Sequence, residues 1–326
     1  MNAQRAKLSK DATTGAQADE TDEAARRPEG ADRRSATPDR AAETATSDST
    51  PLIIAHRGAS AHAPENTLAA FARAFDDGAD GLEFDVRLAR DGVPVVIHDA
   101  TLERTASRRL RVSALTSVEL GTTDVGTWFN RRYPARARAD FSAECVPTLE
   151  QVLQTFGARS KRLYVELKHE PGEDYASLVA EAVRLARSLS LASRVCIESF
   201  ALEVVAEVKR VAPEIRTAAL FERTLARPVR SARSIVVAAL GCSADELALH
   251  RSLVGERVVR AARLAGLDSL VWTVDSPAWI HRAQRHGLSA LITNQPARMR
   301  AALEGMLQHP TLEAASSPAR RRNLHP

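Results

Sequence analysis

Three carboxylates stand at alternating positions within two apolar runs of the sequence. In the run GLEFDV, Glu83 and Asp85 alternate with apolar residues, and in the run RLYVEL the same holds for Glu166. This period of two is typical of β-strands, whose side chains point alternately to opposite faces, so the carboxylates are expected to share one face. Unpaired buried charges are very costly. The pattern therefore indicates either a hard divalent cation, Mg²⁺ or Ca²⁺, or an ion-pair network with arginines or Lys168.

Two histidines, an arginine and a tryptophan end other apolar runs. His56 and His98 each close a predicted strand, and imidazole titrates near neutral pH, so the two could serve as acid and base. The alternative is one histidine in the core and one at the surface. Arg57 could hold a phosphate or carboxylate group with its planar guanidinium, or cap a helix. Trp272 is either part of the core or a wall of a substrate cleft.

The elements that would position these residues alternate regularly along the chain. Repeated strand–helix alternation predicts a parallel sheet. With about eight such units and no GxGxxG motif, an α/β fold of the (β/α)8 TIM-barrel type is favoured over a doubly wound sheet. Residues 99–147 interrupt the alternation and predict a small insertion after an early strand. The predicted strands are 52–56, 81–86, 93–98, 162–167, 194–199, 216–221, 246–250, 269–274 and 289–293.

The two ends of the chain differ in composition from its middle. Residues 1–50 contain almost no large apolar side chains, which predicts a disordered N-terminal tail, and 308–326 predict a flexible C-terminal tail around a barrel at 51–307. Neither a secretory h-region nor a membrane span is recognisable, and the three cysteines lack disulfide or metal-ligand spacing. These features favour a cytoplasmic protein.

The charge of the chain bears on its possible partners. A formal net charge of +4 over 326 residues is slight, and no nucleic-acid-binding motif accompanies it, so nucleic acid is not expected as a partner. The sequence predicts no particular oligomeric state.

Many short motifs of the chain resemble, in the same order, those of the glycerophosphodiester phosphodiesterase family. Each motif is weak alone, but their shared order over about residues 51–302 is highly specific. They are HRG (56–58), PENT (64–67), GLEFDV (81–86), DGVPVVIHD (91–99), TLERT (101–105), DVGTWF (124–129), VPTLEQVL (146–153), VELK (165–168), LVWTVD (270–275) and ALITNQP (290–296).

The resemblance implies a metal-dependent TIM-barrel hydrolase of lipid and glycerol metabolism. Its reaction would cleave glycerophosphodiesters into an alcohol and sn-glycerol 3-phosphate. Open questions are the headgroup, the choice of Mg²⁺ or Ca²⁺, the nucleophile (water or the glycerol 2-hydroxyl) and which histidine is the acid. Matching the motifs assigns His56 and His98 as the acid/base pair, Glu83, Asp85 and Glu166 as metal ligands, and Arg57 and Lys168 beside the phosphate. Trp272, at the end of another predicted strand, is predicted as a further substrate contact.

Four further residues are expected near this site. Glu65 of the PENT motif would orient Arg57 or His56, and Asn66 would cap the following helix. Asn294 occupies a position at which many relatives carry aspartate. Glu198 ends a strand as Glu166 does, so it could extend the site or pair with a cation.

Two alternative functions remain beside the main prediction. A lysophospholipase-D-like enzyme would need an apolar groove for an acyl chain. The insertion, which carries Trp128 and Phe129, is a candidate cover for the substrate. A catalytically inactive barrel that only binds phosphodiesters would show a broken metal set or a missing histidine, whereas all five of those positions are filled here.

Overall fold

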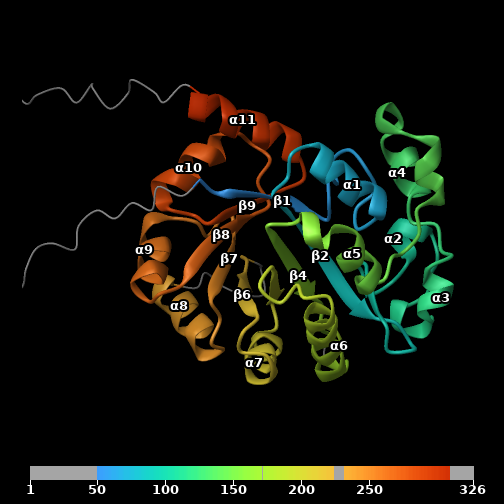
Figure 1. The fold of residues 1–326 in the computed structure, drawn as a ribbon, viewed down its shortest axis with the longest axis horizontal. Coiled ribbons are helices and arrows are strands. Elements are labelled where there is room, and N and C mark those ends of the chain that lie inside the picture. The colour runs from blue at the N-terminus through green and yellow to red at the C-terminus, as the bar shows by residue number, and fades with distance from the viewer. Residues whose placement is uncertain (1–49, 171, 224–230, 309–326) are drawn as a thin grey trace, which may run out of the picture. The chain divides into compact units, whose positions relative to one another are not determined.

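Eight parallel strands form a closed barrel with helices around it (Figure 1). The computed structural model describes residues 50–170, 172–223 and 231–308 of the chain. The tails predicted at 1–50 and 308–326 lie, except for their inner residues Thr50 and Gln308, outside the described residues. The strands are β1 (Leu52–His56), β2 (Gly81–Leu88), β3 (Pro94–Val96), β4 (Arg162–Leu167), β5 (Val195–Ser199), β6 (Arg216–Phe221), β7 (Glu246–His250), β8 (Asp268–Trp272) and β9 (Ala290–Thr293).

The order of the strands closes the sheet. It runs β1-β9-β8-β7-β6-β5-β4-β2, and β2 pairs back onto β1 in parallel. Each barrel strand is followed along the chain by at least one helix that covers it. The predicted (β/α)8 TIM barrel with a small insertion is therefore confirmed.

One of the nine predicted strands has a different place from the one expected. The run 93–98 contains only β3, which pairs antiparallel with β2 and lies outside the barrel. The chain reverses at Asp91-Gly92, where Gly92 has a φ of +77°, and so tight a turn permits only antiparallel pairing. The expectation that His98 ends a strand is consequently wrong. It lies in a loop two residues beyond β3.

Helices form where apolar residues recur at a helical spacing. In α1, for example, Ala70, Phe71 and Ala74 make the buried face. The longer helices are α1 (Leu68–Asp76), α5 (Leu149–Phe156), α6 (Tyr175–Ser188), α7 (Leu202–Val211), α8 (Ala232–Gly241), α9 (Glu256–Leu264), α10 (Ala278–His286) and α11 (Pro296–Gln308). The shorter ones are α2 (Glu103–Ala106), α3 (Ser117–Leu120) and α4 (Thr127–Arg132), with 3₁₀ turns at Val112–Ala114, Pro134–Arg136, Ala139–Ala143 and Gly157–Arg159.

Alternation along the strands separates an inner and an outer core. On β1, Ile54 points into the barrel and packs with Tyr164 and Leu270, whereas Ile53 and Ala55 pack under the helices. The same alternation places polar side chains inside the barrel near the carboxyl ends of the strands. This is the end at which TIM barrels carry their active sites.

The insertion has small apolar clusters of its own. Leu102, Leu115 and Leu120 pack together in one of them, and Phe129 packs on Phe141 in another. In Figure 1 the helices α2, α3 and α4 of this segment lie together beside β2 and α1. None of the described helices is both long and apolar enough to cross a membrane.

Candidate active site

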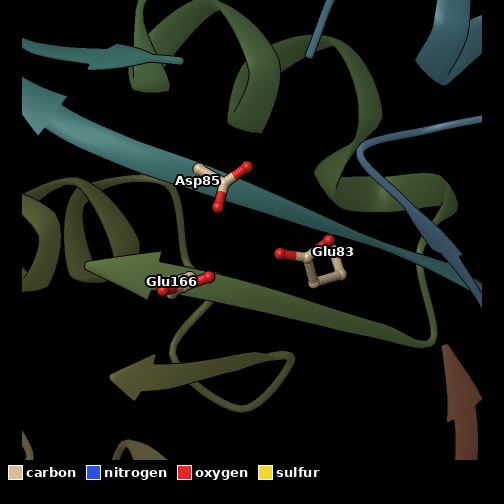
Figure 2. A group of neighbouring side chains, drawn as sticks. All are labelled: Glu83, Asp85 and Glu166. Atoms are coloured by element: carbon tan, nitrogen blue, oxygen red, sulfur yellow. The ribbon is translucent and has the colours of Figure 1, made fainter. Parts of the chain in front are cut away.

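Three buried carboxyl groups from β2 and β4 meet inside the barrel (Figure 2). Glu83 and Asp85 project from β2, and Glu166 projects from the position of β4 that pairs with Asp85. Their exposed fractions are only 3%, 0% and 7%. One ligand oxygen from each residue lies within 4.8 Å of the others. The three carboxylates therefore share one face of the sheet, as the period-two pattern predicted.

Two cations hold part of this cluster by ion pairs. Arg57 Nε lies 3.0 Å from Asp85 Oδ2, and Lys168 Nζ lies 2.9 Å from Asp85 Oδ1 and 2.7 Å from Glu166 Oε1. The ion-pair network that the sequence left open is thus present. Burial raises the pKa of Asp85, but the charges of Arg57 and Lys168 outweigh it and hold that pKa well below its usual range.

The two cations leave negative charge uncompensated. Among the described residues, no lysine or arginine side chain forms an ion pair with Glu83. Burial and the neighbouring Asp85 raise the pKa of Glu83 well above its usual value, and burial raises the pKa of Glu166 to about 7. A buried, converging set of carboxylate oxygens with excess negative charge fits a hard divalent cation. The three residues predicted as metal ligands therefore have a donor set suited to that ion.

His56 is held by an amide from the far end of the chain. Its Nδ1 lies 2.7 Å from Oδ1 of Asn294, which also accepts a hydrogen bond from Ser60. Asn294 Nδ2 donates to Asp275 Oδ2 at 2.9 Å. Because a carboxylate only accepts, Asp275 fixes the orientation of the amide, so Nδ1 of His56 must donate to Oδ1.

The other nitrogen of His56 faces the carboxylate cluster. Nε2 lies 3.8 Å from Glu83 Oε2. Burial, together with the charge of Arg57, lowers the pKa of His56 to about 4. The ring is therefore neutral near pH 7, with its lone pair on Nε2.

His98 has a charged partner instead. Its Nδ1 lies 2.7 Å from Asp99 Oδ1, and Asp99 Oδ2 accepts a hydrogen bond from Arg104 at 2.6 Å. The hydrogen bond from His98 lowers the pKa of the Asp99 carboxyl below its usual range, and the hydrogen bond and charge of Arg104 lower it further. Arg87 Nε donates to the carbonyl of His98 and so anchors the loop. These contacts leave Nε2 as the nitrogen of His98 that is available to a ligand.

Glu65 organises the arginines near the site. Arg57 Nη1 donates to its Oε1 at 2.9 Å, and Arg104 donates to both of its oxygens. The expectation that Glu65 orients Arg57 is confirmed. The expectation for Asn66 is wrong, because Thr67 caps α1, whereas Asn66 has a φ of +58° and donates to Asp85 Oδ2 at 2.9 Å. The left-handed backbone turns its amide toward the carboxylates and away from the helix.

The two histidines, together with Arg57, Lys168, Glu83 and Glu166, line a cavity of about 180 Å³. Trp272 lines it, with its Nε1 bonded to the carbonyl of Ala248, so it is a wall of the cleft. Trp128 and Phe129 of the insertion do not line it, contrary to the expectation that they cover the substrate. Phe129 is fully buried within the insertion. The lining residues are His56, Arg57, Glu83, His98, Glu166, Lys168, Glu198, Phe200, Leu220, Glu222, Trp272 and Ile292.

Some of these contacts were not predicted from the sequence. Asp99 directly follows His98 in the chain, and Arg104 belongs to the next motif, TLERT, so their closeness in sequence could have indicated that the three residues lie together. Asp275 carried no such signal, because it acts on His56 only through Asn294. The strand pattern did indicate Glu198, and the structure places it in the cavity wall.

Comparisons with known proteins agree with this arrangement. The sequence model of the glycerophosphoryl diester phosphodiesterase family matches residues 56–298. The glycerophosphodiester phosphodiesterase of Bacillus subtilis (strain 168) is 32% identical over 251 residues, which are 75% of this chain and 84% of the relative.

Two solved structures are similar in fold. The crystal structure of a glycerophosphodiester phosphodiesterase from Agrobacterium tumefaciens str. C58 is 31% identical, with a TM-score of 0.63 over 77% of this chain and 99% of that one. An Oleispira antarctica phosphodiesterase in complex with the product sn-glycerol-3-phosphate is 26% identical, with a TM-score of 0.67 over 78% of this chain and 97% of that one. With the family's sequence model spanning the barrel and its site, the chain belongs to the glycerophosphoryl diester phosphodiesterase family.

Proposed function

We propose that this phosphodiesterase hydrolyses glycerophosphodiesters to an alcohol and sn-glycerol 3-phosphate, using a divalent cation and two histidines. The observation that carries the proposal is the cluster of three buried carboxylates beside one cavity, which two of them, Glu83 and Glu166, line together with both histidines. The relative from Oleispira antarctica, which binds sn-glycerol 3-phosphate as its product, supports this choice of substrate.

Glu83, Asp85 and Glu166 would hold the cation. When bound there, a divalent cation neutralises the phosphodiester and stabilises the charge that develops in the transition state. Arg57 and Lys168 face the same cavity and present N–H groups to phosphate oxygens. Their ion pairs with Asp85 keep both side chains in place before the substrate arrives.

The hydrogen bonds of the two histidines suggest different roles for them. His56 donates through Nδ1 to a neutral amide, so its Nε2 can take the proton of the attacking hydroxyl as general base. His98 is paired with the carboxylate of Asp99, which balances the charge of an imidazolium, so its Nε2 can protonate the departing alkoxide. The P–O bond to the nucleophile forms as the ester P–O bond breaks, and each histidine handles one proton.

The proposal is tested by assaying sn-glycerol 3-phosphate release from glycerophosphocholine and glycerophosphoethanolamine. Release is expected to stop after treatment with EDTA and to return when Mg²⁺ or Ca²⁺ is restored. Glu83→Gln should remove most activity, whereas Glu103→Gln, a matched change at an exposed residue of the insertion, should leave it intact. Full release from the metal-free protein would disprove the metal-dependent mechanism.

The apolar side of the cavity is the observation that favours a second substrate class. Phe200, Leu220, Trp272 and Ile292 form this wall and could contact a lysophospholipid. The same assay with lysophosphatidylcholine tests that alternative. A higher kcat/KM for the lysophospholipid than for glycerophosphocholine would reverse the assignment.

We also propose that the enzyme works in the cytoplasm. The three cysteines, Cys145, Cys196 and Cys242, are free thiols, which supports a reducing compartment. Fractionation of cells that make the protein, followed by immunoblotting, tests this location.

A further inference from the structure

Glu198 on β5 is a buried carboxyl group to which the proposed mechanism assigns no role. Its side chain is 1% exposed, and its Oε2 is buried without a hydrogen-bond partner in the described part of the chain. It lines the same cavity as the two histidines. Buried polar atoms in native proteins almost always have a partner, so an unpaired carboxyl in the wall of a ligand cavity points to a partner on the ligand.

The register of the sheet fixes where that partner must lie. Asp85, Glu166 and Glu198 are paired in one row across β2, β4 and β5, and neighbouring strands are about 4.8 Å apart. Glu198 therefore stands one strand beyond the metal-binding carboxylates. It is not a member of the group of residues whose oxygens lie within 4.8 Å of one another.

Beyond Glu198 the inner surface of the barrel is apolar. The next position in the row is Ala218 on β6, which is packed in the inner core, and Leu220, two residues further along β6, lines the cavity. Leu220, Trp272 and Ile292 enclose this part of the cavity. A ligand whose phosphate lies at Glu83, Asp85 and Glu166 can thus extend a short arm past Glu198 against an apolar wall.

We propose that Glu198 hydrogen-bonds a hydroxyl group of the substrate's glycerol arm and so selects a polyol ester over a simple alkyl ester. The inference rests on the proposed function and names the group that recognises the glycerol moiety. The carbon chain of glycerol would pack on the apolar wall, while its hydroxyls need polar partners. A carboxyl group can accept a hydrogen bond from an alcohol whether or not it is protonated.

The first experiment compares two substrates that differ only in their hydroxyls. Glycerophosphocholine is assayed beside propylphosphocholine, which lacks both hydroxyls, with wild type, Glu198→Leu and Glu198→Gln. Wild type should prefer glycerophosphocholine by about 100-fold or more in kcat/KM, since a site built to bind a hydroxyl rejects the analogue without it. Glu198→Leu should lose most of that preference, and Glu198→Gln, which keeps a hydrogen-bonding group, should retain much of it.

The form of the loss separates recognition from other roles. If Glu198→Leu lowers kcat/KM equally for both substrates, Glu198 has a structural role and the inference is wrong. A raised concentration of Mg²⁺ or Ca²⁺ for half-maximal activity would show that Glu198 acts through the cation, which also overturns it. A changed preference between choline and ethanolamine headgroups, with the hydroxyl preference intact, would place the contact on the leaving alcohol instead.

A binding experiment tests the inference even if a variant has lost its catalytic activity. Calorimetric titration with sn-glycerol 3-phosphate and with n-propyl phosphate, both in the presence of the cation, should show tighter binding of the first to wild type. That difference should disappear in Glu198→Leu, or in Glu198→Ala if the leucine variant does not fold. Equal affinities for the two ligands in wild type would contradict the inference.

The two levels of the proposal can fail separately. If wild type prefers sn-glycerol 3-phosphate through Glu198 but cleaves no glycerophosphodiester, the proposed activity is wrong and the recognition of glycerol stands. If wild type cleaves both phosphocholine esters equally well, the activity stands and the role of Glu198 is disproved.

Discussion

His56 and Asn294 stand 238 positions apart in the chain, yet Nδ1 of the histidine lies 2.7 Å from Oδ1 of the asparagine. They meet because β1 and β9 are adjacent strands where the barrel closes. Asp275, in the loop three residues beyond the neighbouring strand β8, fixes the amide from its other side. This contact decides which nitrogen of His56 faces the substrate.

Replacing Asn294 by alanine should therefore damage catalysis more than binding. We expect kcat to fall by about 10–100-fold, because a misplaced imidazole transfers protons poorly, while KM changes little. Initial-rate measurements with glycerophosphocholine test this. A change in KM without a loss in kcat, or no change in either constant, would show that the amide does not position His56.

Removing His98 should have an effect that depends on the leaving group. With glycerophosphocholine, His98→Ala is expected to lower kcat by about 10²–10⁴-fold, since general acid catalysis contributes on that scale. A p-nitrophenyl ester of glycerol phosphate should lose far less, because p-nitrophenolate leaves without a proton. His281→Ala, at an exposed position on α10, serves as the control. Equal losses on the two esters would exclude His98 as the general acid.

Divalent cations should stabilise the folded protein as well as support activity. Binding between three crowded carboxylates relieves their repulsion, and ligand at about 100 times its dissociation constant contributes roughly 2.7 kcal/mol. Thermal unfolding of the EDTA-treated protein should shift to higher temperature when Mg²⁺ or Ca²⁺ is added. Glu83→Gln should reduce the shift. A melting temperature that neither ion changes would argue against a site at Glu83, Asp85 and Glu166.

Asp80 provides a prediction about stability at the opposite end of the barrel. Its carboxylate accepts a hydrogen bond from Ile53 N at 2.9 Å and forms ion pairs with Lys161 and Arg300. Burial by itself raises the pKa of Asp80, but the hydrogen bond and the two cations outweigh it, so the pKa is lowered. A lowered pKa in the folded state means that the stabilisation is present above the unfolded-state value, about 3.9, and is lost as the pH falls below it.

Asp80→Asn should accordingly destabilise the protein by about 1–2 kcal/mol at pH 7, because it removes a charge-assisted hydrogen bond and two ion pairs whose cations, Lys161 and Arg300, remain in contact with solvent. The difference from wild type should narrow as the pH falls below about 4, because the carboxyl of the unfolded chain then takes up a proton while that of the folded protein, with its lowered pKa, still resists it. Urea unfolding at pH 7 and at pH 3 measures both values. A difference that is the same at the two pH values would show that the charge of Asp80 does not contribute.

The sequence alone determined the barrel and the face that carries the acidic residues. Strand periodicity is a local property, because the backbone turns each successive side chain to the opposite face. Glu83, Asp85 and Glu166 could therefore be placed together without coordinates. The order of the family motifs then identified His56 and His98 as their companions.

Only the tertiary structure decided the partners of those groups. A three-residue run such as β3 carries no sign of its direction, so the loop position of His98 and its pairing with Asp99 followed from the hairpin fold. The partnership of His56 with Asn294 depends on the closure of the barrel, which brings together residues that no local pattern connects. Likewise, the sequence does not show whether a glutamate at a strand end has a hydrogen-bond partner. The unpaired oxygen of Glu198 became visible only when every neighbouring strand was in place.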